Sequence, residues 1–159
     1  MFQVGDKIAH PMHGAGVVDS IVEKKINDKE MLYYVLKIPV GGMLVMIPAD
    51  STEEIGVRPI VSRDEAEKIL ENMATIETEM VQNWNHRYRE NMMRIKSGDL
   101  LEVARVVKSL MLRDQSRGLS TGERKMLHSA KQILLSELVM ALGCTYEELE
   151  TRISDLIEA

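Results

Sequence analysis

The feature that most constrains the fold is a change in the spacing of apolar residues near residue 60. Before this point, apolar residues alternate with polar ones or form short runs, and Val, Ile and Tyr are frequent. This pattern favours β-strands at residues 7–10, 15–23, 31–38 and 43–47. The breaks between them contain the turn formers Pro11, Gly14, Asn27, Asp28 and the pair Gly41 and Gly42. Short strands joined by tight turns predict a small, strongly bent sheet or barrel.

After residue 60 the apolar spacing becomes helical. Ser62 is followed by Glu65, which is a capping box and predicts the start of a helix. The same pattern recurs at Ser120 with Glu123 and at Thr145 with a later Glu. The predicted helices span residues 62–73, 78–96, 99–117 and 120–142, with a last short one from residue 145. The second half is therefore expected to be a compact all-α bundle.

These two halves predict an α+β fold made of two domains. Residues 1–58 form the β-barrel and residues 59–159 the helical domain. A chain of 159 residues is long enough for two small domains that each bury a core. Because no Gly/Ser-rich linker separates them, the boundary rests on the change of period alone.

Several functional classes are excluded by composition and motifs. The single cysteine, Cys144, rules out an internal disulfide and predicts a cytoplasmic location. The longest apolar runs are far shorter than a membrane span, so no membrane association is expected. His10 and His13 flank a proline in a turn, and neither C-x-x-C nor H-E-x-x-H occurs. We therefore expect no metal, no cofactor and no enzymatic activity.

The charge distribution points to a polyanion that binds one part of the surface. The net charge is −5, which by itself argues against nucleic acid. Residues 83–131, however, carry 11 Lys and Arg against 5 Asp and Glu, and both flanking segments are acidic. Because salt confines each field to about 10 Å, a basic segment attracts phosphate locally whatever the net charge.

The segment of residues 83–89 contains the single tryptophan of the chain, Trp84, among polar and cationic residues. One interpretation is a core tryptophan, for which Met80, Val81 and Tyr88 could supply apolar neighbours. The other is a ring that enters the minor groove of DNA and unstacks a base step, while nearby cations hold the phosphates. The segment alone leaves both interpretations open.

The chain resembles the CarD/CdnL family of bacterial transcription regulators, whose first domain is shared with the transcription-repair coupling factor. In the first half the resemblance lies in residues 4–6 (VGD), 10–16 (HPMHGAG), 34–37 (YVLK) and 47–48 (IP). In the second half it lies in residues 83–84 (NW), 87–88 (RY), 97–99 (SGD), 103–107 (VARVV), 117–120 (RGLS), 122–127 (GERKML) and 130–134 (AKQIL). It covers nearly all of residues 1–143, and the last helix has little signature.

The resemblance implies a Tudor-like, SH3-like β-barrel that binds the β subunit of RNA polymerase through an edge strand. An exposed edge can extend a partner's sheet through its unpaired N–H and C=O groups. By position, the polymerase-binding residues would be Lys24, Ile26, Met43, Val45, Met46 and Ile47. Met46 stands where the family has an arginine, so the contact gains adaptable apolar surface and loses a charge. Met46 facing the barrel core is the alternative.

The resemblance also implies that the helical domain binds promoter DNA at the upstream edge of the transcription bubble. Trp84 would enter the minor groove and hinder re-annealing, which stabilises the open complex. By position, the DNA-binding residues would be Trp84, Asn85, His86, Arg87, Arg89, Arg124 and Lys125. Phosphate contacts and a wedge read DNA shape rather than base identity, so little sequence specificity is expected.

The leading alternative is an adaptor that binds polymerase or another protein without wedging DNA. Trp84 would then belong to the core, and the basic segment would contact an acidic partner. We expect a monomer in the functional complex, although a methionine-rich surface could support self-association.

Overall fold

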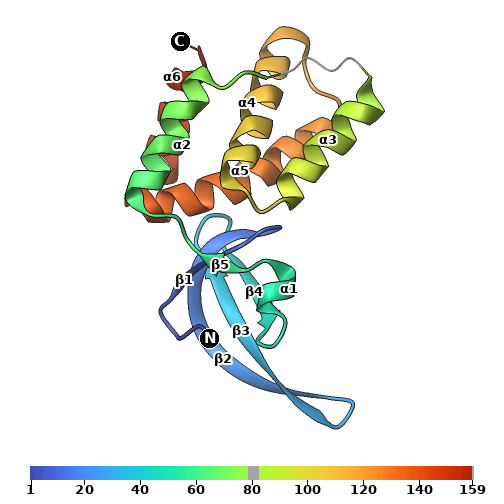
Figure 1. Ribbon diagram of the computed structural model, residues 1–159, viewed down its shortest axis with the longest axis vertical. Helices are drawn as coiled ribbons and strands as arrows, with labels where there is room; N and C mark the ends of the chain where they lie inside the picture. The colour runs from blue at the N-terminus through green and yellow to red at the C-terminus, as the bar shows by residue number, and fades with distance from the viewer. Residues whose placement is uncertain (79–82, 159) are drawn as a thin grey trace.

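The first half of the chain forms one antiparallel sheet in the computed structural model, which describes residues 1–78 and 83–158. Its strands are β1 (Lys7–His10), β2 (Gly14–Ile26), β3 (Lys29–Ile38), β4 (Met43–Pro48) and β5 (Arg58–Pro59). They lie in the order β4-β3-β2-β1-β5. Apart from one short helix that precedes β5, the helices follow the sheet in the chain, so the predicted α+β class is confirmed (Figure 1).

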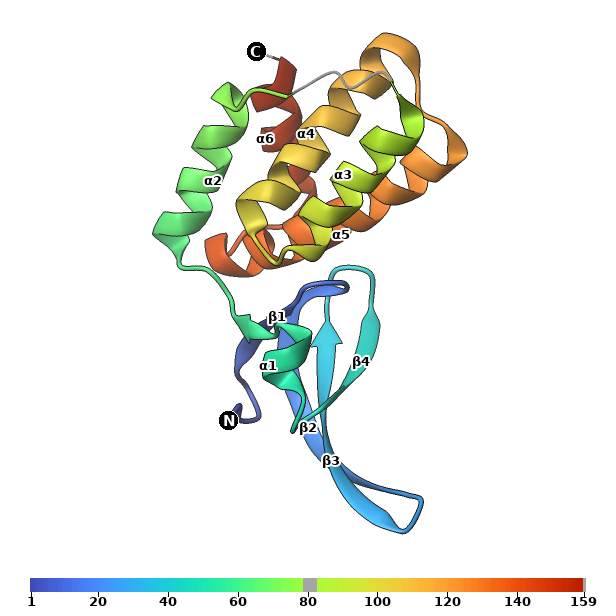
Figure 2. The same ribbon diagram turned by 45° about the vertical axis from the view of Figure 1, so that its right-hand side comes forward.

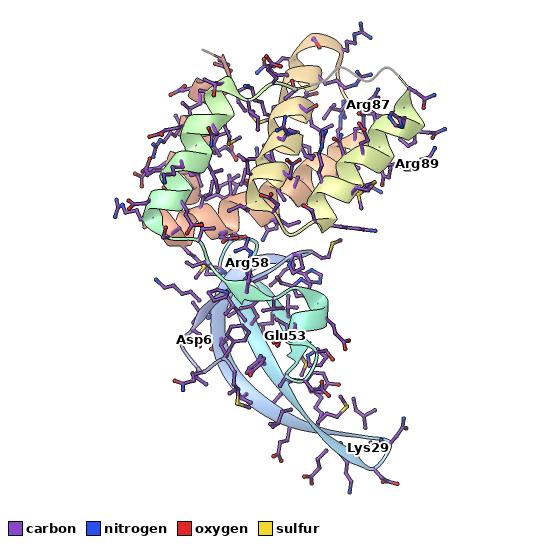
Figure 3. All side chains as sticks on the ribbon, viewed as in Figure 1. Asp6, Lys29, Glu53, Arg58, Arg87 and Arg89 are labelled. Atoms are coloured by element: carbon purple, nitrogen blue, oxygen red, sulfur yellow. The ribbon has the colours of Figure 1, made fainter. Side chains whose placement is uncertain are left out.

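Strands β2 and β3 form a long, bent hairpin that extends away from the helices, with Lys29 close to its tip (Figure 3). Both strands are longer than predicted. Asn27 and Asp28 connect them with positive φ angles of 52° and 62°, which is typical of the two-residue turn whose twist matches a hairpin. A register shift between Val18 and Ser20 marks a bulge, and bulges bend the strand that carries them.

One face of the sheet carries its own small core. Tyr34 and Ile47 are cross-strand partners on β3 and β4, and each is 1% exposed. Phe2 packs edge-on against Tyr34, with the ring centroids 5.8 Å apart. The short helix α1 (Thr52–Ile55), which the sequence pattern does not predict, adds the partly buried Ile55 to this core. The sheet thus buries one face and leaves the other available.

The second half forms five further helices, and most of their starts agree with the predicted caps. They are α2 (Arg63–Thr75), α3 (Trp84–Lys96), α4 (Leu100–Arg117), α5 (Thr121–Leu142) and α6 (Tyr146–Glu158). The Ser62 hydroxyl accepts the Glu65 amide at 3.1 Å, as a capping box requires. Ser120 caps α5 in the same way.

The predicted start of the second helix, Thr78, is wrong. Residues 76–78 are not helical, and residues 79–82 lie outside the described residues. Helix α3 begins at Trp84 because Asn83 is its cap, and the Asn83 side-chain oxygen accepts the His86 amide at 3.0 Å.

Helix α5 packs into the helical core and also joins the helices to the sheet (Figure 2). Glu137 on α5 is 1% exposed. Its carboxylate accepts two hydrogen bonds from the Arg58 guanidinium, at 2.7 and 3.0 Å, and one from the Val61 amide at 2.8 Å. A single buried carboxylate therefore binds the last strand of the sheet and the segment that leads into α2.

The neighbouring turn of α5 makes a second set of contacts with the sheet. The Ser136 hydroxyl accepts the Ala15 amide at 2.9 Å, and the Gln132 side chain donates to the Val40 carbonyl. A side chain at Gly14 would collide with the Ser136 hydroxyl, so the backbone of β2 lies directly against this side chain of α5. These contacts hold sheet and helices in one arrangement. The division of the chain at residue 58 stays a prediction.

Candidate nucleic-acid interface

Trp84 lies on the surface at the start of helix α3. It is the first residue after the Asn83 cap, and its side chain is 43% exposed. The interpretation of Trp84 as a core residue therefore does not hold. Helices α3 and α5 begin side by side at the end of the helical domain furthest from the sheet (Figure 2).

Two contacts hold the indole ring of Trp84 in place. One face stacks on Tyr88, with ring centroids 5.1 Å apart and planes 21° from parallel. The indole N–H donates a hydrogen bond to the Ser120 hydroxyl at 3.2 Å. Such aromatic stacking adds about 1 kcal/mol beyond surface burial. The ring is therefore exposed and oriented at the same time.

Arg87 does not lie where the sequence analysis expects a phosphate-binding residue. It is 7% exposed, and its guanidinium makes two hydrogen bonds to the Glu123 carboxylate, at 2.9 and 3.2 Å. Arg87, Asn91 and Ile95 are the buried residues of α3 and follow one another at intervals of four, on the face that packs against the bundle. The expectation that Arg87 contacts DNA is therefore corrected. Arg87 holds α3, the helix that carries Trp84, against Glu123 of α5.

Glu123 is the centre of a buried charge cluster beneath Trp84. Burial raises the pKa of this carboxyl, but hydrogen bonds and charges from Arg87, Ser120 and Arg113 outweigh burial and hold the pKa below its ordinary value. The Arg113 Nε atom lies 3.7 Å from the carboxylate. Glu123 therefore stays ionised at neutral pH and ties the start of α5 to α3.

The remaining predicted DNA-binding residues are exposed on the same two helices, α3 and α5. Arg89 is exposed on α3 and points away from the bundle (Figure 3). Arg124 and Lys125 are exposed near the start of α5, where the helix dipole favours an anion. Asn85 and His86 are also exposed, and the His86 ring lies 3.6 Å from the Glu90 carboxylate. This surface, formed by the exposed residues of the starts of α3 and α5, is called the Trp84 surface below.

The pairing register divides the predicted polymerase-binding residues between the two faces of the sheet. Lys24, Ile26 and Met46 pair with alternate residues of β3 and share the face opposite the core. Met46 is 39% exposed, so it does not face the core. Leu44, which the sequence analysis does not select, is 65% exposed on the same face.

Ile47 is corrected as a side-chain contact, because it is 1% exposed and lies on the core face. Met43 and Val45 share that face and pack against the sheet core, half-buried. Strand β4 nevertheless stands at the end of the strand order, so one side of its backbone has no strand partner among the described residues. Backbone and outer-face side chains together make β4 a candidate binding edge.

The described residues lack the features of a metal site and of a membrane-spanning helix. Within residues 1–78 and 83–158, no three His, Cys, Asp or Glu side chains are grouped as a metal site requires. No helix in the same ranges is long and apolar enough to cross a membrane.

Comparison with known proteins identifies the family. A family model described as "CarD-like/TRCF RID domain" matches residues 2–61, and one described as "CarD, C-terminal domain" matches residues 68–154. The chain is 34% identical over 151 residues to the Bacillus subtilis (strain 168) protein named "Putative transcription factor YdeB". This match covers 95% of the chain and 99% of its relative. The chain therefore belongs to the CarD family of transcription factors.

Proposed function

We propose that this protein binds the β subunit of RNA polymerase through its sheet and promoter DNA through the Trp84 surface. In this role it stabilises the open promoter complex as a monomer. The observation that carries the proposal is the exposed, oriented ring of Trp84 at the start of α3, on a pair of helices that also expose Arg89, Arg124 and Lys125.

The DNA contact combines a wedge with phosphate binding. Inserting an apolar ring from the minor groove costs a few kcal/mol of base stacking, which phosphate contacts offset. Arg89, Arg124 and Lys125 are exposed and available for those contacts. Arg87 contributes indirectly, because its ion pair with Glu123 fixes α3 against α5. Since these contacts read backbone and shape, we expect little sequence specificity.

The polymerase contact is assigned to strand β4 and to the outer face of the sheet. A β4 edge can add to a sheet of the polymerase β subunit through main-chain hydrogen bonds. Lys24, Ile26, Met46 and Leu44 supply side chains on the outer face. Support for this assignment comes from the family match of the first domain.

The two contacts act together by linkage. A ligand that binds the open complex better than the closed complex stabilises the open one by its differential affinity. Binding to polymerase raises the effective concentration of DNA at the Trp84 surface, so a weak DNA contact suffices. Because the surface reads little sequence, polymerase determines where on the chromosome the protein acts.

The experiment that tests the proposal measures the lifetime of open complexes on a ribosomal-type promoter. It compares the wild-type protein with Trp84→Ala and with Met93→Ala. Met93 is a matched control because it is on the same helix and 72% exposed, outside the Trp84 surface. We expect the wild-type protein and Met93→Ala to lengthen the lifetime, and Trp84→Ala to lose the effect while still binding polymerase.

If Trp84→Ala lengthens the lifetime as much as the wild-type protein does, the result contradicts the wedge. It then favours the adaptor, in which the protein acts through polymerase alone. Binding to polymerase is measured in parallel with Met46→Glu and Leu44→Glu, which place a charge on the outer face of β4. Undiminished binding of both variants contradicts the assignment of that face.

A further inference from the structure

The Ser120 hydroxyl makes three hydrogen bonds, and this uses its full capacity. Its oxygen lies 3.2 Å from the Trp84 indole nitrogen, 3.2 Å from the Glu123 amide nitrogen and 3.2 Å from the Glu123 Oε1 atom. An indole N–H and a backbone N–H can only donate, and an ionised carboxylate can only accept. The hydroxyl therefore accepts twice and donates its one proton to Glu123.

The direction of the hydroxyl is fixed by the charge cluster beneath it. The Glu123 side chain is 4% exposed and is held by two hydrogen bonds from Arg87. Because this carboxylate takes the Ser120 proton, a lone pair of the hydroxyl is left to face Trp84. The buried ion pair thereby determines which way the surface acceptor points.

The same contact decides which part of the ring is exposed. The Trp84 Cζ2 atom is on the same edge of the indole as the nitrogen, two bonds away from it. It lies 3.5 Å from the position of a Cβ at Gly122. The polar edge of the ring thus faces α5, and Tyr88 covers one of its two faces. The single N–H of the ring is already hydrogen-bonded to Ser120, and the other ring atoms are hydrocarbon.

We infer that Ser120 is a positioning residue for Trp84, which orients the indole and bonds its N–H so that only hydrocarbon is presented outward. An indole whose N–H is bonded within the protein can leave water without losing a hydrogen bond. The orientation is a property of the protein alone. Its use in entering stacked bases rests on the proposed function.

The test uses fluorescence, because Trp84 is the single tryptophan of the chain. Time-resolved anisotropy measures the fraction of the indole that moves rapidly within the folded full-length protein. We expect Ser120→Ala to lower the ratio of held to mobile indole about fivefold, the equivalent of about 1 kcal/mol. Ser120→Thr, which keeps the hydroxyl, restores the wild-type ratio.

Ser62→Ala is the matched control for the loss of a helix cap. Ser62 caps α2 with the same hydroxyl-to-Glu arrangement, and none of its hydrogen bonds involves Trp84. Its anisotropy should equal that of the wild-type protein. An indole that is equally immobile in Ser120→Ala and wild type overturns the inference, and so does equal loosening in Ser62→Ala.

The open-complex lifetime separates this inference from the proposed function. We expect Ser120→Ala to shorten the lifetime and Ser120→Thr to restore it. If Trp84→Ala still lengthens the lifetime as much as the wild-type protein does, the proposed function fails, and the anisotropy alone then decides the role of Ser120.

Discussion

Replacing Glu137 by Gln should destabilise the protein more than any surface ion pair does. The Glu137 side chain is 2% exposed and accepts hydrogen bonds from the Arg58 guanidinium and the Val61 amide. Gln has nearly the same shape, so no cavity forms. Its amide group, however, has one oxygen for these donors, and its –NH₂ group faces a donor.

The magnitude follows from the donors that lose their acceptor. An unsatisfied buried donor costs about 1–3 kcal/mol, and breaking a fully buried ion pair costs about 3–5 kcal/mol. The Arg58 side chain is 34% exposed and can be partly rehydrated, which places the Glu137→Gln loss near the lower limit, at about 3 kcal/mol. For a chain of this length, that loss lowers the melting temperature by about 6–12 °C.

Differential scanning calorimetry measures this shift, and Glu67→Gln is the matched control. Glu67 pairs with Arg152 at 2.6 Å, but the two side chains are 37% and 47% exposed. An exposed pair contributes about 0–1 kcal/mol, so the control should melt within about 4 °C of the wild type. If Glu137→Gln melts no lower than Glu67→Gln, the assignment of Glu137 as the main link between sheet and helices is refuted.

Outcomes are also expected for four further substitutions. Trp84→Ala should lower the free energy of unfolding by about 1–2 kcal/mol in urea titrations, because Trp84 is 43% exposed. Truncating a buried tryptophan costs roughly 3–5 kcal/mol, so a loss of that size would show that the ring belongs to the core. Gly14→Ala should cost about 2–4 kcal/mol by the same assay, because this residue has a φ of +106° and no room for a Cβ. Gly42→Ala, at a φ of +66° with nothing within 4 Å, should cost only about 1 kcal/mol. Burial, with the nearby charge of a second histidine, lowers the pKa of His10 to about 4, and its Nδ1 atom accepts the Met12 amide. Between its ordinary pKa of about 6.5 and pH 4, the His10 side chain takes up a proton only in the unfolded chain. The free energy of unfolding is therefore highest above this range and falls as the pH is lowered through it. His10→Asn should flatten this part of a stability-against-pH curve, and an unchanged slope would contradict the assignment.

Local signals in the sequence predict most of the fold. Residues 7–10 are a strand as expected, and the caps Ser62, Asp99 and Ser120 mark helix starts within one residue. Caps are readable because the side chain bonds an amide two or three residues away. The start of α3 was misplaced because Asn83 carries the same signal without the glutamate of a capping box.

Contacts between distant residues account for what the sequence does not predict. Residue type alone does not distinguish Arg87, which is buried, from Arg89, which is exposed. The available signal was the spacing of Arg87, Asn91 and Ile95, which places them on one helix face. Similarly, Glu137 interrupts an apolar stretch of α5, which indicates a buried polar partner. Its partner Arg58 is 79 residues away and is found only in three dimensions.

Under the proposed function, the contacts of α5 with the sheet would affect which promoters respond. The sheet is held against the helices by Glu137, Ser136 and Gln132 of α5. The distance from the β4 edge to Trp84 is therefore fixed by the fold. If polymerase holds that edge, the ring meets the duplex at one defined position, where successive base steps are about 3.4 Å apart. Flexible pyrimidine–purine steps unstack more easily than others. Promoters would then differ in their response according to which step lies at that position, although the protein contacts no base edge.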